Sequence, residues 1–239
     1  MNSSTARRLL AINREFYDRF GASFSATRQR LQSGVNKILK TIHVDDSVLD
    51  LGCGNGHFLH ELIRHGHKTP LLGVDFSLPL LRNAGSTEEI EFREVDLVKL
   101  SAFSDQLLEA GRRWSVVTMF ATMHHIPSTE IRLDILRTVK KLVKPEGRFI
   151  LSNWQFLNSE KLKARIQPWS RVGLADSDVD EGDYLLDWRS GGEGLRYAHQ
   201  FSAEELLWLA GQAEMKLSES FLSDGENGRL GLYQIWLNG

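Results

Sequence analysis

The stretch VLDLGCGNG, residues 48–56, decides the fold of this chain. It opens as an apolar run of strand type that carries one acid, Asp50, and continues into a turn in which Gly52, Gly54 and Gly56 alternate with other residues. Glycines in such a turn let a ligand approach the backbone closely, and a helix that begins near Gly56 points its N-terminus at that ligand. The stretch therefore predicts a ligand-binding loop between a buried strand and a helix.

A second acid, Asp75, ends the next strand-like run, GVD at residues 73–75. In nucleotide-binding α/β folds, an acid at this position accepts hydrogen bonds from the hydroxyls of a ribose. Taken alone, Asp75 could also be a helix cap. In register with the glycine loop, it predicts a site for a nucleotide-type cofactor.

Outward from this stretch, short apolar runs alternate with helical patterns. Strands are expected at 47–51, 71–75, 90–96, 114–120 and 147–153, with helices near 56–65, 78–85, 101–111 and 129–143. Strand–helix alternation predicts a parallel sheet covered on both faces. Two last strands, near 215–222 and 230–237, are joined by a turn rich in Gly and Asn, which predicts a hairpin.

The fold class expected is therefore α/β, a Rossmann-like, seven-stranded, mostly parallel sheet with an antiparallel C-terminal hairpin. We expect one domain with four parts, and Ser202 as the N-cap of the last helix. The parts are an N-terminal helical cap at 1–45, a cofactor-binding core at 46–154, a substrate lid at 155–200, and the last helix and strand pair at 201–239.

Composition excludes several classes of protein. The chain has 239 residues, 41% of them hydrophobic and 25% charged, which is typical of a globular domain. Its one cysteine, Cys53, rules out an intramolecular disulfide and disfavours a cysteine-based zinc site, and no metal site is expected. A net charge of −2 argues against a protein that coats DNA. With no apolar run long enough to span a membrane, we expect a soluble, cytoplasmic protein.

The loop and three further motifs resemble class I S-adenosylmethionine-dependent methyltransferases. The motifs are VDL at 95–97, MFATMHHI at 119–126 and LVKPEGRF at 142–149. One departure is Ser115, where many members carry Asp. The resemblance implies S-adenosylmethionine as cofactor, bound by these residues: Asp50, Gly52, Cys53, Gly54, Asp75, Phe76, Asp96 and Leu97.

A narrower resemblance lies outside the core. FYD at 16–18 with FSATR at 24–28, GDYLLDW at 182–188 and LRYAHQF at 195–201 are similar to motifs of the tRNA wobble-uridine methyltransferases, which methylate the carboxylate of 5-carboxymethyluridine. The chain departs from the family pattern at Ala198, where a tyrosine is usual, and at Asp187, where a proline is usual.

This resemblance implies the residues that act on the acceptor. The expected catalytic residues are Arg28, His125, Arg196, Tyr197 and His199, and the expected substrate-binding residues are Tyr17, Trp154 and Trp188. Arginines suit a carboxylate because the guanidinium offers paired donors. The alternatives are a salt bridge from Arg196 to Asp183 or Glu193, aromatic packing within the lid, and a loop-capping role for the histidines.

The function expected is methyl transfer to a carboxylate of a modified wobble uridine in tRNA. One alternative is an O- or N-methyltransferase of small molecules, in which a histidine would act as general base. A noncatalytic S-adenosylmethionine-binding subunit is the alternative from another class. Eukaryotic members of the resembled family work with a small activator protein, so tRNA and such a protein are the expected partners, with no DNA and no membrane.

Overall fold

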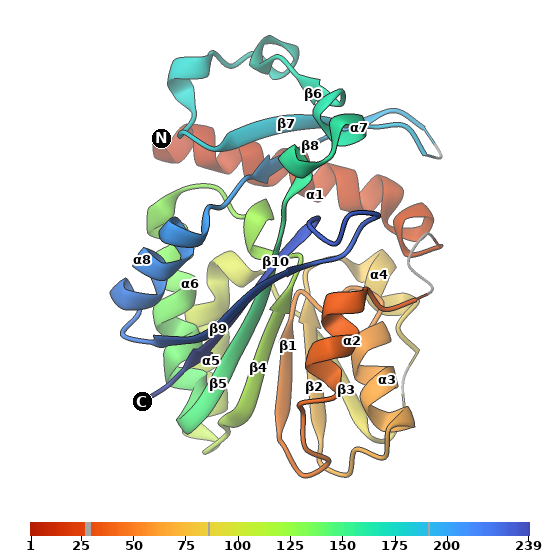
Figure 1. Ribbon diagram of the computed structural model, residues 1–239, viewed down its shortest axis with the longest axis vertical. Helices are drawn as coiled ribbons and strands as arrows, with labels where there is room; N and C mark the ends of the chain where they lie inside the picture. The colour runs from red at the N-terminus through yellow and green to blue at the C-terminus, as the bar shows by residue number, and fades with distance from the viewer. Residues whose placement is uncertain (27–29, 86, 191) are drawn as a thin grey trace.

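Seven strands form the central sheet of the protein, shown in Figure 1. The computed structural model describes residues 1–26, 30–85, 87–190 and 192–239; at Ala22 and residues 24–26 only the backbone is described. The strand order is β3-β2-β1-β4-β5-β10-β9, and β10 is antiparallel to both neighbours. The strands are β1 (Val48–Leu51), β2 (Leu71–Asp75), β3 (Ile90–Glu94), β4 (Trp114–Phe120), β5 (Val143–Trp154), β9 (Lys216–Ser223) and β10 (Gly231–Leu237). The predicted fold class is confirmed.

Helices cover both faces of this sheet (Figure 1). On one face lie α5 (Leu100–Glu109), α6 (Thr129–Leu142) and α8 (Ala203–Gln212), and on the other α2 (Ser33–Leu39), α3 (His57–Arg64) and α4 (Leu78–Arg82). All four residues of β1 are buried, as expected for a strand with helices on both sides. Leu49 packs with the α6 side and Val48 with the α3 side, so the sheet separates two hydrophobic cores.

The strand order reverses beside β1, and this reversal positions the site. From β1 the chain continues to β2 and β3 on one side, then crosses to β4 on the other. Loops that leave β1 and β4 at their carboxyl ends therefore diverge and leave a crevice between them. Ligands of open α/β sheets bind in such a crevice, so the glycine loop after β1 faces it.

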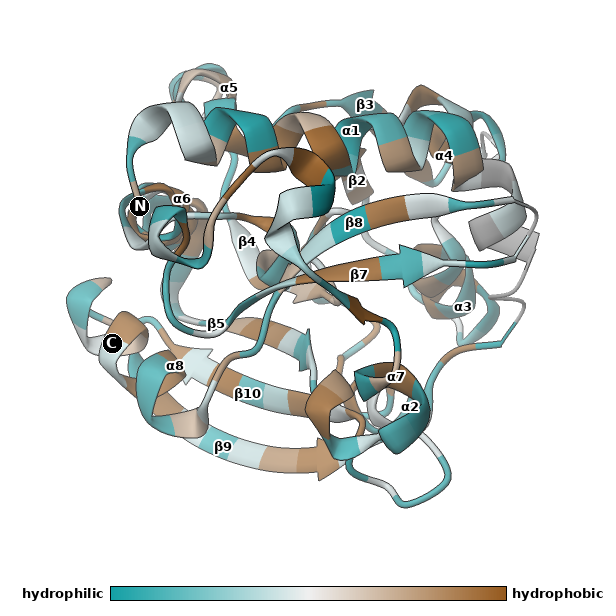
Figure 2. Ribbon diagram, turned by 90° about the horizontal axis from the view of Figure 1, so that it is seen from above, coloured by the Kyte–Doolittle hydropathy of each residue, from teal (hydrophilic) through white to brown (hydrophobic). Residues whose placement is uncertain are grey.

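A second layer covers this edge of the sheet. The 24-residue helix α1 (Ser3–Ala26) crosses above the carboxyl ends of the strands, and a three-stranded antiparallel sheet lies on it (Figure 2). The small sheet consists of β6 (Ile166–Gln167), β7 (Asp183–Trp188) and β8 (Gly194–His199), with the short helix α7 (Glu160–Lys163) alongside. These strands lie within 155–200, where the sequence predicts a lid but its patterns indicate no particular strand. The division of the chain into four parts remains a prediction.

Two local predictions can be checked against the structure. The Ser202 hydroxyl accepts a hydrogen bond from the Glu205 N–H at 3.0 Å, which confirms Ser202 as the N-cap of α8. The sequence PEG at 145–147 also predicts a turn that launches the strand after it. The structure has a bulge inside β5 there, because Glu146 has a φ of 61° and the pairing with β4 shifts. Within the described residues, no helix is both long and apolar enough to cross a membrane.

Candidate cofactor and acceptor site

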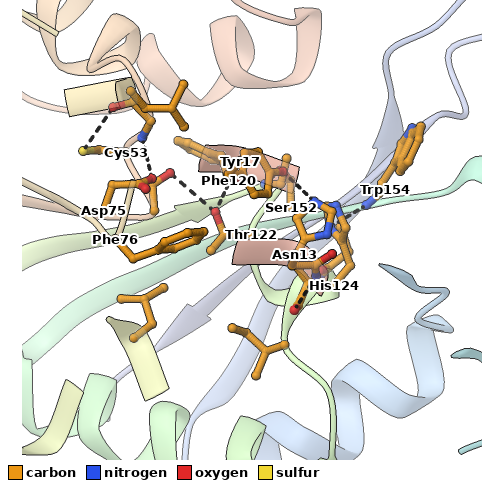
Figure 3. A pocket seen from close by; sticks show the side chains of 18 of the residues that line it. Asn13, Tyr17, Cys53, Asp75, Phe76, Phe120, Thr122, His124, Ser152 and Trp154 are labelled. Atoms are coloured by element: carbon orange, nitrogen blue, oxygen red, sulfur yellow. Dashed lines mark hydrogen bonds between the residues drawn. The ribbon is translucent and has the colours of Figure 1, made fainter. Parts of the chain in front are cut away.

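A cavity of about 510 Å³ opens where β1, β4 and β5 end beneath α1. Figure 3 shows Asp75 and Phe76 on one side of it and His124 and Trp154 on the other. Twelve of the residues that the sequence predicted line this cavity. They are Tyr17, Asp50, Gly52, Cys53, Gly54, Asp75, Phe76, Asp96, Leu97, His125, Trp154 and Arg196.

The glycine loop needs glycine for two different reasons. Gly52 has a φ of +76°, and a Cβ there would collide with the Thr122 side chain. Gly54 has a φ of +57°, but a Cβ there would have no described atom within 4 Å. Since both conformations lie in the left-handed region, both favour glycine. The open space at Gly54 lets a ligand approach the backbone from the cavity.

Asp75 links the glycine loop to the end of β2. Its two carboxylate oxygens accept the Gly54 N–H at 2.9 Å and the Ser77 N–H at 2.8 Å. Burial raises the pKa of Asp75, and these backbone hydrogen bonds oppose the rise. The hydrogen bond from the Ser77 N–H shows that Asp75 also has the capping role that its sequence position allows as an alternative. Each oxygen keeps a lone pair, so the same carboxylate can also accept ribose hydroxyls.

Replacing Asp75 should weaken cofactor binding. We expect Asp75→Ala to cost about 1.5–3 kcal/mol of binding free energy, or about 10- to 150-fold in Kd for S-adenosylmethionine, because hydrogen bonds to a charged group are lost. Calorimetry measures this, with Glu94→Ala as the control, since exposed Glu94 pairs with Asp75 in register on β3. Equal affinity in the two variants would reject the role of Asp75.

Asp50 is the most perturbed acid of the cavity. It is 3% exposed, and it accepts a hydrogen bond from the Thr118 hydroxyl at 2.7 Å. Burial raises its pKa to about 7, the Thr118 hydrogen bond opposes the rise, and the charge of Asp75 adds to it. None of the ion pairs among the described residues involves Asp50 or Asp75, so these two buried acids favour a cationic ligand.

One end of the cavity suits a flat heterocycle. The Asp96 carboxylate forms an ion pair with Arg14 at 2.7 Å, and Arg14 lies 5.0 Å from the centre of the Phe76 ring. Leu97 lines the same end. These groups offer an apolar ring face with a carboxylate beside it, which fits an adenine and its amino group. Together with the two buried acids, the donor and acceptor set fits S-adenosylmethionine, which carries two positive charges.

Cys53 lines the cavity without a reactive environment. Burial raises the pKa of its thiol well above the ordinary value, and the nearby charges of Asp50 and Asp75 act in the same direction. The thiolate is the nucleophilic form of cysteine, so this side chain stays a neutral wall of the cavity.

The other end of the cavity holds the buried guanidinium of Arg196. The residue is 4% exposed, and its Nε has no hydrogen-bond partner among the described residues. The guanidinium carbon lies 4.5 Å from the ring centre of Trp154 and 5.5 Å from those of Phe16 and Trp188. Burial lowers the pKa of Arg196, although a hydrogen bond to Tyr17 favours the charged form.

The described contacts of Arg196 exclude one alternative that the sequence allows, a salt bridge within the lid. Asp183 lies against Arg132 and His199 instead, and none of the ion pairs in the described part of the chain joins Arg196 to a carboxylate. The predicted alternative of a lid salt bridge to Asp183 or Glu193 is therefore wrong for the described residues. Arg196 is a buried cation at the cavity wall.

Tyr17 and His125 meet beside this cation. The Tyr17 hydroxyl lies 3.0 Å from His125 Nε2, and His125 Nδ1 lies 3.0 Å from the Tyr197 carbonyl oxygen. A carbonyl oxygen only accepts, so we assign the proton of the neutral ring to Nδ1. His125 Nε2 is then the acceptor for the Tyr17 hydroxyl, whose oxygen can face Arg196.

Tyr197 and His199 do not reach the cavity, which corrects the expectation that they join Arg196 there. Successive side chains of a strand point to opposite faces, so Tyr197 and His199 face away when Arg196 faces inward. The Tyr197 hydroxyl donates to Asp183 at 2.6 Å and accepts from Arg132 at 2.9 Å. His199 lies between Asp183 at 2.7 Å and Glu205 at 3.0 Å. This buried network joins β7 and β8 to α6 and α8.

The remaining predicted residues have different positions. Trp188 packs behind Arg196 with Phe16 and lines a neighbouring hollow between α1 and the small sheet, not this cavity. Arg28, with the rest of its motif after Ala26, lies outside the described residues.

Several cavity residues escaped the sequence analysis. Asn153 is 1% exposed, and neither of its amide atoms has a hydrogen-bond partner in the described part of the chain. Asn13 and Arg14 reach the cavity from α1. A polar residue within an apolar helical stripe, as at Asn13, was the one available signal.

Comparisons with known proteins agree with this geometry. The family model described as "Methyltransferase domain" matches residues 24–219. The chain is 22% identical over 166 residues, or 69% of its length, to the tRNA (carboxymethyluridine(34)-5-O)-methyltransferase ALKBH8 of Mus musculus, and 26% identical over 132 residues, or 48%, to the protein-lysine N-methyltransferase efm4 of Schizosaccharomyces pombe. It spans only 23% and 54% of the lengths of these two relatives.

A solved structure gives the same architecture. The DhpI-SAM-HEP complex matches with a TM-score of 0.69 at 16% identity, over 95% of this chain and 97% of that one. At this identity, the likeness shows the fold.

Proposed function

Because the chain belongs to the methyltransferase domain family, we propose that it transfers the methyl group of S-adenosylmethionine to the carboxylate of a modified wobble uridine in tRNA. The family membership confirms the sequence-based predictions of a methyltransferase and of its cofactor. The identity of the acceptor is our proposal, and it rests on the side chains that line the cavity.

The observation that carries the proposal is the buried guanidinium of Arg196, which forms no ion pair with a carboxylate of the described residues. A buried charge without a partner is costly, and it is retained where a ligand of opposite charge completes it. A carboxylate fits the planar fork of a guanidinium through paired hydrogen bonds. An anionic acceptor in this cavity would pair with Arg196 beside Tyr17 and Trp154.

The same arrangement suits transfer without a general base. S-adenosylmethionine, when bound, supplies a methyl group activated by its sulfonium. A carboxylate is already ionised at neutral pH, so no side chain has to remove its proton. Arg196 and Tyr17 would orient the carboxylate oxygen for in-line attack, and the covering helix α1 would exclude water.

The uridine and tRNA parts of the proposal rest on aromatic rings at the cavity and on arginines along α1. Trp154 and Tyr17 place aromatic rings at the cavity, on which a base can stack. Exposed arginines along α1 can contact phosphates; they are Arg7, Arg8, Arg14 and Arg19. The ALKBH8 relative is named for a carboxymethyluridine in tRNA.

A lysine acceptor, as named for the efm4 relative, fits the cavity poorly. The guanidinium of Arg196 would repel an ammonium group, and the low local dielectric strengthens that repulsion. A small carboxylate fits as well as a nucleotide does, so this rival needs an experiment.

The test compares two acceptor pools. Total tRNA whose methyl esters have been hydrolysed by mild alkali, and a metabolite extract, are each incubated with the purified chain and labelled S-adenosylmethionine. We expect label in the tRNA. Label in the extract alone would favour a small-molecule acceptor, and label in neither would favour a noncatalytic subunit or a required partner protein, which adding a cell lysate would distinguish.

The dependence of the rate on pH should show no titration of a general base. We expect kcat with a carboxylate acceptor to stay within about threefold between pH 6 and 8, because the acceptor is already ionised and no side chain has to remove a proton from it. A steep rise that His125→Ala abolishes would instead indicate a hydroxyl or amine acceptor.

A further inference from the structure

The side chain of Asn13 joins three parts of the acceptor end. Asn13 is 4% exposed and lies on α1. Its Nδ2 donates to the carbonyls of His125 at 3.0 Å and Tyr197 at 3.2 Å, and its Oδ1 accepts the Tyr197 N–H at 2.8 Å. We propose that Asn13 is a positioning residue, which holds the side chains of His125 and Arg196 in place for the acceptor. This inference rests on the proposed function.

The Asn13 amide acts as a substitute for a neighbouring strand. β8 pairs with β7 along one side, and in the described chain no strand pairs with its other side. The N–H and C=O of Tyr197 point out from that free edge to the same amide group. One side chain therefore satisfies both backbone groups, as a peptide of an adjacent strand would.

This contact sets the register of α1 against β8. Arg196 precedes Tyr197 in the strand, and Tyr17 lies one helical turn after Asn13. Fixing the Tyr197 backbone on Asn13 therefore fixes where Arg196 stands relative to Tyr17.

The contact between Asn13 and Tyr197 also determines which ring nitrogen of His125 carries the proton. The Tyr197 carbonyl, held by Asn13, accepts from His125 Nδ1 at 3.0 Å. Asn13 Nδ2 also donates to the backbone carbonyl of His125, so the ring and the backbone of His125 are both held through Asn13. His125 Nε2 is left as an acceptor for the Tyr17 hydroxyl, which keeps the Tyr17 oxygen directed to the guanidinium.

The test variant is Asn13→Asp, which keeps the shape of the side chain. Its carboxylate can accept the Tyr197 N–H but cannot donate to the two carbonyls, so Tyr197 and His125 must shift. We expect kcat/KM for alkali-treated total tRNA to fall at least tenfold, while Kd for S-adenosylmethionine changes by less than about threefold. Asn36→Asp is the control, since Asn36 is exposed on α2 and its side chain donates to the Leu31 carbonyl, away from the cavity, and it should leave both values unchanged.

A second measurement does not depend on any acceptor. Nitrogen chemical shifts of the His125 ring, assigned by comparison with His125→Asn, report which nitrogen carries the proton. We expect Nδ1–H in the wild-type protein and a shift towards Nε2–H or a mixture in Asn13→Asp. If that variant does not fold, Asn13→Ala, which leaves the carbonyls free of repulsion, replaces it in both measurements.

The outcomes separate the two claims. Nε2–H in the wild-type ring, an unchanged ring in the variant, or a parallel loss of cofactor and acceptor binding overturns the positioning role. Nδ1–H that changes in the variant, with no methylation of tRNA by the wild-type protein, supports the positioning of His125 and overturns the proposed acceptor.

Discussion

Arg196→Met should lower kcat/KM for the acceptor by about 30- to 1,000-fold and leave Kd for S-adenosylmethionine within about threefold. The variant removes the cation that pairs with the acceptor carboxylate, and losing one partner of a buried charge pair costs about 2–4 kcal/mol. The effect should fall mainly on the acceptor because Arg196 packs on Trp154, which lies across the cavity from Asp75 and Phe76. Steady-state kinetics and calorimetry measure the two quantities.

Two further variants sharpen this result. Arg196→Lys should recover only part of the loss, because lysine keeps the charge but lacks the planar fork. Arg189→Met is the matched control, since Arg189 is exposed and pairs with Asp187 close to the small sheet. An Arg196→Met enzyme as active as the Arg189→Met control would contradict the carboxylate assignment.

Asp50→Asn should stabilise the cofactor-free protein at pH 8 by about 2–4 kcal/mol relative to wild type, and by much less at pH 5. The pKa of Asp50 is about 7 in the folded protein, raised from 3.8 mainly by burial. Between these values the folded state binds a proton that the unfolded state has lost, so stability decreases as pH rises from about 4 through 7. The full shift corresponds to about 4 kcal/mol, and an isosteric amide removes this loss.

Denaturant unfolding at pH 5 and pH 8 checks the sign, with Asp45→Asn as a control that removes an exposed carboxylate. S-adenosylmethionine should restore more stability to the wild-type protein at pH 8 than to Asp50→Asn, because its positive charge compensates the buried carboxylate. A wild-type protein that gains stability relative to Asp50→Asn between pH 5 and 8 would contradict this account of Asp50.

The core of the fold was predictable because its signals are local. Each strand of the parallel sheet is a short apolar run, and the turn after Leu51 carries the glycines that its backbone requires. The strand-end acids then follow from the topology, since carboxyl ends of parallel strands meet at one edge. The positions of Asp75 and Asp96 at the cavity could be predicted in this way.

The small sheet was missed because its signals are not local. Its strands are short, polar residues interrupt them, and α1, more than a hundred residues away in sequence, covers them. The resemblance implies one common role for the motif around Arg196, whereas a strand places neighbouring side chains on opposite faces. The period of two in residues 195–199 carried that information, and it would have excluded Tyr197 and His199 from the cavity.

The polar partners of the site were beyond sequence reasoning for a different reason. Asn13 has a role only because the free edge of β8 and the carbonyl of His125 come to the same point. Arg132 is likewise buried only because Asp183 and Glu205 meet it from two other elements. Such contacts depend on tertiary packing, which single-residue patterns do not encode.

The most direct test of the central claim is the chemical stability of the product. The chain is incubated with alkali-treated tRNA and S-adenosylmethionine labelled in its methyl group, and the labelled RNA is then exposed to mild alkali. A methyl ester is hydrolysed under these conditions, whereas a methyl group on a hydroxyl or amine is retained. The account predicts that the label is released as methanol. Label that stays on the RNA would contradict transfer to a carboxylate.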